Sequence, residues 1–154
     1  MTAGPADGVP GSGIRHVLFD ADGVIQTIPG GWYTAMEPYV GERAQEFLHG
    51  TNQERHRAAH MRVALGYDAL FDVSCYSCEL GLAKPDPAFF AAAARRIGAD
   101  PSSILFIDDS PRNVDGARAA GLPAEQWEQE QGHEALIALL AGHGVIAHPG
   151  KPVR

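Results

Sequence analysis

The sequence predicts an α/β fold built around a mostly parallel sheet. Two short apolar runs, at 17–19 and 104–107, have the β-branched and aromatic composition of buried strands. Between and after them lie segments of helical length, two of which have a polar cap, a proline at the first position and a glycine beyond the end. Strands that alternate with helices of this length form βαβ units, and the strands of such units run parallel.

Local signals justify each element in turn. A helix should begin at Thr51, because Thr51 and Glu54 have the spacing of a capping box and apolar residues follow at helical spacing. The helix after Asp86 has a proline at its first position and Gly98 just past its end. In chain order we expect strands at 17–19, 71–78 and 103–110, and helices from residue 51, at 87–97, at 111–120 and at 134–142.

Length and composition are those of one globular domain: 154 residues, of which 45% are hydrophobic and 20% charged. The net charge of −7 argues against nucleic acid or an anionic membrane as a partner. No apolar run is long enough to span a membrane, residues 1–13 lack the pattern of a signal peptide, and a cytoplasmic location is expected. We expect a disordered leader at 1–13, a core domain at 14–144 and a C-terminal tail at 145–154.

Charged and polar residues gather after the expected strands, where parallel sheets bind their ligands. Clustered carboxylates repel each other unless a cation joins them, and ligands that are all oxygen favour Mg²⁺ over zinc. A lysine and a hydroxyl beside such a cation suit a phosphate, and a carboxylate two residues from another suits a nucleophile paired with an acid/base. The candidate site residues are Asp20, Ala21, Asp22, Thr51, Asn52, Lys84, Asp108 and Asp109.

Four short stretches, FDADGV, TN, KPDPAFF and FIDDSPRNVDGARAAG, stand in this order between residues 14 and 121. They resemble the four motifs of the haloacid dehalogenase-like (HAD) hydrolase superfamily. The resemblance implies a Rossmann-like three-layer core and a Mg²⁺-dependent phosphatase that acts on a phosphate monoester through an aspartyl-phosphate intermediate. It does not identify the substrate, which could be a small molecule or an exposed phosphate ester.

The resemblance also implies catalytic roles. Asp20 would be the nucleophile that becomes phosphorylated, and Asp22 would protonate the leaving group and then activate water. Family members that cleave carbon–halogen bonds lack this second aspartate, so Asp22 favours phosphoryl transfer over dehalogenation. Thr51 would hold the phosphoryl oxygens, and Lys84 would offset the negative charge of nucleophile and phosphate.

The resemblance also implies which residues bind the phosphate and the metal. The backbone amides of Ala21 and Asp22 would bind the phosphoryl group, with Asn52 nearby. Asp20, Asp109 and the backbone carbonyl of Asp22 would bind Mg²⁺. Asp108 would be either a second metal contact or the residue that orients Lys84.

The intervals from Asp20 to Thr51 and from Thr51 to Lys84 are both too short for the cap domain that many family members carry. The stretch AQEFLHG before Thr51 is also a poor central strand, since such strands are rich in Val, Ile and Leu. We therefore expect a core whose cap is absent or deleted, with 32–49 as a flap or cap remnant. The sheet would then have a gap beside its first strand. Natural loss, engineered deletion and a longer parent chain remain open explanations.

Three alternatives accompany the phosphatase interpretation. A phosphomutase of the same family would pass the phosphoryl group to a sugar hydroxyl instead of water. A poorly active core would act as a scaffold or oligomerisation module, associating through exposed apolar surface at 32–48. A response-regulator receiver domain has similar residues, but its lysine follows its acidic pair, whereas Lys84 precedes Asp108 and Asp109. Cys75 and Cys78 are expected to be reduced thiols.

Overall fold

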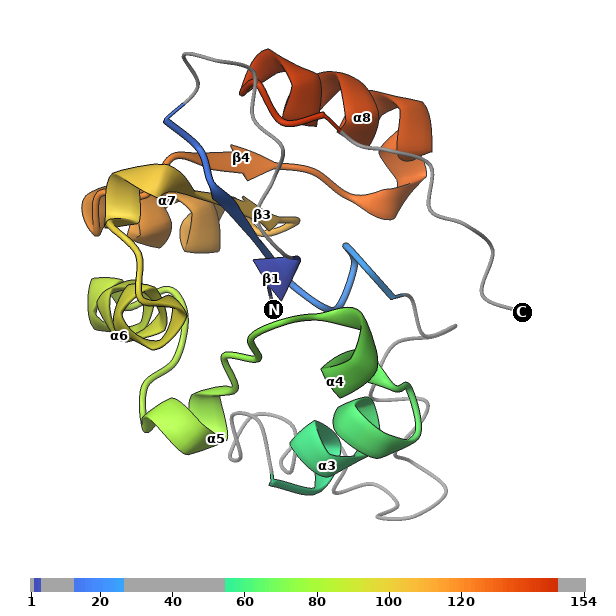
Figure 1. Ribbon diagram of the computed structural model, residues 1–154, viewed down its shortest axis with the longest axis vertical. Coiled ribbons are helices and arrows are strands. Elements are labelled where there is room, and N and C mark those ends of the chain that lie inside the picture. Colours follow the sequence, from blue (N-terminus) through green and yellow to red (C-terminus); the bar gives the residue numbers. More distant parts are fainter. Residues whose placement is uncertain (1, 4–12, 27–54, 147–154) are drawn as a thin grey trace.

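A four-stranded sheet forms the centre of the computed structural model, which describes residues 2–3, 13–26 and 55–146 (Figure 1). The strands lie in the order β1-β2-β3-β4, with β2, β3 and β4 parallel and β1 antiparallel to β2. This arrangement confirms the expected α/β fold with a mostly parallel sheet. The strands are β1 (Thr2–Ala3), β2 (His16–Phe19), β3 (Ile104–Asp108) and β4 (Ala124–Gln126).

Helices cover both faces of the sheet. Because successive strand residues point to opposite faces, Leu18 and Phe106 pack against α6 (Pro87–Ile97) and α7 (Pro111–Ala119). On the other face, Val17, Leu105 and Ile107 pack in a second cluster with Leu140 of α8 (His133–Gly142). Every residue of β3 is buried, as expected for the central strand of a sheet that is covered on both faces.

Capping explains why α6 begins and ends as the sequence predicts. The side chain of Asp86 accepts a hydrogen bond from the backbone amide of Ala88 at 2.9 Å, and Pro87 occupies the first turn. Gly98 ends the helix in a left-handed conformation, with φ 76°. Helix α7 likewise begins with a proline after Ser110, although the Ser110 side chain makes no capping hydrogen bond.

The strand expected at 71–78 does not form. In the described part of the chain, the segment instead leads into the short helix α5 (Ser77–Leu80). Cys75 and Cys78 are free thiols that pack against different hydrophobic clusters. Strand β4 was not predicted, because a run of three residues, Ala-Glu-Gln, has no strand-like composition.

Two short helices follow the segment that the structure does not describe. Helix α3 (Arg55–Val63) and helix α4 (Tyr67–Leu70) pack through Ala58, Met61 and Tyr67 against the loop after β2. The capping box expected at Thr51 and Glu54 lies outside the described residues, as does the proposed flap or cap remnant at 32–49.

The edge of β2 is not bare, contrary to the expected gap in the sheet. Thr2 pairs with Leu18 and Ala3 with Val17, so two residues of the expected leader belong to the sheet. The first residue of the expected tail, Val145, is also part of the core, since it is buried against Leu140. Among the helices of the described ranges, none has the length and apolar character needed to cross a membrane.

Candidate active site

Three aspartates meet at the carboxyl ends of β2 and β3. Asp20 follows β2, and its backbone amide donates a hydrogen bond to the carbonyl of Ile107 at 2.8 Å. Asp108 ends β3, and Asp109 follows it. One carboxylate oxygen from each aspartate lies within 4.8 Å of the others. Parallel pairing of β2 with β3 therefore brings together acids that are far apart in the sequence.

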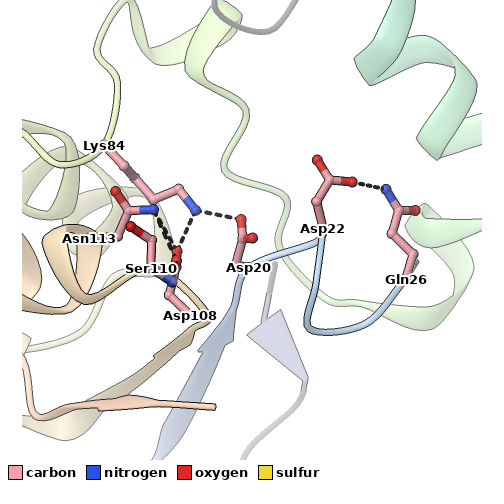
Figure 2. A network of polar contacts seen from close by, with 7 residues as sticks. All are labelled: Asp20, Asp22, Gln26, Lys84, Asp108, Ser110 and Asn113. Carbon is pink, nitrogen blue, oxygen red and sulfur yellow. Dashed lines mark hydrogen bonds and ion pairs between the residues drawn. The ribbon is translucent and has the colours of Figure 1, made fainter. Parts of the chain in front are cut away.

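Lys84 joins two of these acids. Its ammonium forms an ion pair with Oδ1 of Asp20 and another, at 2.6 Å, with Oδ2 of Asp108 (Figure 2). The lysine side chain is only 13% exposed and that of Asp108 is fully buried. Burial lowers the pKa of Lys84, but the charges of Asp20 and Asp108 outweigh burial and raise the pKa above its usual value. Lys84 is therefore a fixed positive charge beside Asp20.

Asp108 is held by the first turn of α7. Its Oδ1 accepts hydrogen bonds from the backbone amide of Ser110 at 2.9 Å and from the side-chain amide of Asn113 at 3.0 Å. Its Oδ2 accepts from Asn113 at 3.1 Å as well as from Lys84. Both oxygens of this buried carboxylate thus have partners. Neither Ser110 nor Asn113 was predicted as a site residue, although their place just after the acidic pair was a usable signal.

Asp109 lies against the loop after β2. Burial raises the pKa of its carboxyl, and the charges of Asp108 and Asp20 raise it further. Gly23 in that loop has a left-handed φ of 77°, and a Cβ there would lie 2.4 Å from Oδ2 of Asp109. Only glycine suits this position, and Gly23 was not among the residues predicted for the site.

Asp22 makes a different set of contacts. Its Oδ1 accepts a hydrogen bond from Nε2 of Gln26 at 2.6 Å, and Oε1 of Gln26 accepts one from the hydroxyl of Tyr67 at 2.6 Å. Figure 2 shows Asp22 and Gln26 on the far side of Asp20 from Lys84. Asp22 is therefore close to the carboxylate cluster along the chain but is oriented by other residues.

A pocket of about 70 Å³ lies beside Asp20. Asp20, Asp22 and Lys84 line it together with Ala21, and the remaining wall is mainly apolar. Helix α3 contributes Ala58 and Met61 to this wall, and the rest comes from β2, β3, α6 and residues 75–77. The predicted phosphate ligands Thr51 and Asn52 lie outside the described residues.

Comparisons with known proteins agree with this geometry. The profile of the family described as haloacid dehalogenase-like hydrolase matches residues 46–121. That range contains Thr51, Lys84, Asp108 and Asp109 but not Asp20. A crystal structure of an uncharacterized protein from Corynebacterium glutamicum is 25% identical, with a TM-score of 0.58, over 86% of this chain and 97% of that chain.

Two curated relatives are phosphatases by name. Phosphatase MT3486 of Mycobacterium tuberculosis is 36% identical over 84 residues, which are 54% of this chain and 39% of that protein. Phosphoglycolate phosphatase of Xylella fastidiosa is 32% identical over 74 residues, which are 48% of this chain and 32% of that protein. The chain thus spans less than two fifths of the length of either relative. Together with the order of the motifs and the grouping of their acids around Lys84, these matches place the chain in the haloacid dehalogenase-like hydrolase family.

Proposed function

We propose that this chain is a Mg²⁺-dependent phosphatase core that hydrolyses a phosphate monoester through an aspartyl-phosphate at Asp20. One observation carries the proposal: Lys84 pairs with both Asp20 and Asp108 in a pocket that Asp22 also lines. An aspartate and a phosphate dianion repel each other, and a cation held between them lowers that repulsion. The names of the curated relatives support the same reaction class.

Two displacements at phosphorus make up the reaction. A carboxylate oxygen of Asp20 forms a bond to phosphorus while the bond to the ester oxygen breaks, and Asp22 gives that oxygen a proton. Asp22, now a carboxylate, takes a proton from water as the water oxygen attacks the phosphorus of the aspartyl-phosphate. The Asp20–phosphorus bond breaks, inorganic phosphate leaves and both carboxyl groups return to their starting state.

The residues present fit a divalent cation. Asp20 and Asp109 offer oxygen ligands of the kind Mg²⁺ prefers, and mutual repulsion contributes to the raised pKa of Asp109. We assign Asp20, Asp109 and the backbone carbonyl of Asp22 to the metal. When bound, Mg²⁺ would supply positive charge that offsets the charge of the phosphoryl oxygens.

Asp108 has a different role in this proposal. Hydrogen bonds from Ser110 and Asn113 and the ion pair with Lys84 engage both of its oxygens. We therefore assign Asp108 to the orientation of Lys84, the second of the two roles that the sequence left open. Thr51, Asn52 and the amides of Ala21 and Asp22 remain the proposed ligands of the phosphoryl group.

The pocket bears on the class of substrate. Its volume of about 70 Å³ is far below the roughly 300 Å³ at which sites for whole small molecules begin. Within the described part of the chain, the pocket thus accommodates a phosphoryl group, while the alcohol portion of the substrate would lie outside it. This suits a small phosphate ester or a phosphate exposed on a larger molecule.

Hydrolysis of p-nitrophenyl phosphate tests the proposal. We expect turnover that needs Mg²⁺, stops with a chelator and falls at least about 10³-fold in Asp20→Asn, because the nucleophile is lost. Asp115→Asn is a matched control, since Asp115 lies on α7 with its side chain 79% exposed. Acid-quenched protein should carry an acyl phosphate in the parent chain and not in Asp20→Asn. Equal rates for the parent chain and Asp20→Asn would refute the proposal.

A further inference from the structure

Gln26 and Tyr67 form a chain of hydrogen bonds that ends on Asp22. The hydroxyl of Tyr67 donates to Oε1 of Gln26 at 2.6 Å. Nε2 of Gln26 donates to Oδ1 of Asp22, also at 2.6 Å (Figure 2). Neither residue belongs to the four motifs that identify the family. Tyr67 lies in α4, far along the chain from the loop that carries the other two residues. These two hydrogen bonds therefore connect the loop after β2 to the α3–α4 segment.

While Asp22 is ionised, as it is when it activates water, the chemistry of the groups allows one arrangement only. An ionised carboxylate accepts hydrogen bonds and donates none, so Gln26 must turn its NH₂ group toward Asp22. That leaves the carbonyl oxygen of Gln26 facing Tyr67, whose hydroxyl then donates. Burial raises the pKa of Tyr67, so the hydroxyl keeps its proton at neutral pH. Tyr67 thus holds the amide of Gln26 in the orientation that Asp22 requires.

Backbone hydrogen bonds of Gln26 fix its position between Tyr67 and Asp22. The amide of Gln26 donates to the carbonyl of Ala21 at 2.9 Å, and its carbonyl accepts from the amide of Gly23 at 2.8 Å. Tyr67 is 7% exposed and makes an edge-to-face contact with Phe71, with ring centroids 5.5 Å apart. Both ends of the Gln26–Tyr67 contact are therefore anchored, as a group that orients a catalytic side chain must be.

We infer that Gln26, held by Tyr67, is the positioning residue for the acid/base Asp22. The inference rests on the proposed function, in which Asp22 protonates the leaving oxygen and later activates water. On this inference, Oδ1 of Asp22 accepts the hydrogen bond from Gln26 and Oδ2 carries the transferable proton. Gln26 therefore selects the oxygen that acts on the substrate, while Tyr67 prevents the amide from turning over.

Leaving groups of different basicity test this role. An alkoxide leaves only when it is protonated, whereas p-nitrophenolate leaves without a proton. The value of kcat/KM covers the steps up to departure of the leaving group, so it reports Asp22 as an acid. In Gln26→Met, we expect kcat/KM to fall about 10- to 100-fold for an alkyl phosphate and about 3-fold or less for p-nitrophenyl phosphate.

Matched variants separate positioning from folding. Tyr67→Phe removes one hydroxyl and should cause a smaller loss with the same preference for the alkyl phosphate. In the double variant, Tyr67→Phe should not change the ratio of the two kcat/KM values beyond the effect of Gln26→Met, because the hydrogen bond to Asp22 is already lost. Gln131→Met, the same substitution at an exposed position, should leave the ratio unchanged. Equal losses on both substrates in Gln26→Met would overturn the inference.

A second measurement does not depend on activity. In nitrogen-15 NMR spectra of the Mg²⁺-free protein, the side-chain NH₂ of Gln26 should have one strongly shifted proton. Asp22→Ala should abolish that shift, and Tyr67→Phe should reduce it. An unshifted NH₂ group would overturn the inference even if the protein is an active phosphatase. Absence of Mg²⁺-dependent turnover in the parent chain would instead refute the proposed function, while the NMR result still decides whether Gln26 orients Asp22.

Discussion

Replacing Gly116 by alanine should displace the loop that holds Lys84. Gly116 lies in α7, and a Cβ at this position would be 2.0 Å from the carbonyl oxygen of Pro85 and 3.2 Å from the ring of Phe90. Ordinary contact begins near 3.4 Å, so helix and loop must separate by roughly 1 Å or more. Pro85 follows Lys84 directly, and any such shift moves the ammonium relative to Asp20.

Two effects of opposite sign determine how far Gly116→Ala changes the free energy of unfolding. Overpacking costs about 1–3 kcal/mol, and the upper end applies here because the clash is with backbone. Alanine gains about 1 kcal/mol over glycine in the interior of a helix. We therefore expect Gly116→Ala to lower the free energy of unfolding by about 2 kcal/mol, which corresponds to a Tm lower by about 4–8 °C for a chain of this length.

Thermal unfolding followed by circular dichroism measures this change. Gly142→Ala is the matched control, because Gly142 ends α8 and a Cβ there would meet nothing within 4 Å. Its Tm should stay the same or rise slightly. The value of kcat/KM for p-nitrophenyl phosphate should fall at least about 10-fold in Gly116→Ala and remain unchanged in Gly142→Ala. A Gly116→Ala protein as stable and as active as Gly142→Ala would refute the reasoning.

Three further changes probe the charges of the site. Lys84→Met leaves the buried Asp108 carboxylate without its cation and should cost about 3–5 kcal/mol of unfolding free energy in urea titrations; an unchanged midpoint would contradict this. The pKa of Asp109 is raised above 3.8, so the Mg²⁺-free folded state binds the carboxyl proton of Asp109 more tightly than the unfolded state does. The free energy of unfolding therefore falls as pH rises from 3.8 through the raised pKa. Asp109→Asn should therefore raise the Tm of the Mg²⁺-free protein at pH 7 and abolish the rise in Tm that Mg²⁺ causes; a lower Tm would oppose the argument. Gly23→Ala should weaken Mg²⁺ binding, measured by calorimetry, because its Cβ would collide with Asp109; unchanged affinity would show that the loop adjusts.

Elements with local signals could be predicted from the sequence, and elements that depend on partners could not. Helix α6 begins and ends at its predicted residues because Asp86, Pro87 and Gly98 act within a few residues of themselves. Strands β1 and β4 are two and three residues long and form only because β2 and β3 offer free edges. The strand expected at 71–78 also depends on a partner, and the segment leads into helix α5 instead.

Local features of the sequence, namely the order of Asp20, Lys84, Asp108 and Asp109 and the apolar runs before the acids, predicted that these groups meet at one edge of the sheet, and they do lie together there. The orientation of these groups depends on how the helices pack around them. Lys84 pairs with Asp108 because α7 lies against the loop after Lys84, and Asp22 turns to Gln26 because α4 places Tyr67 beside it. Hydrogen bonds between residues far apart in the chain depend on how the elements pack, and no spacing within one segment encodes that packing.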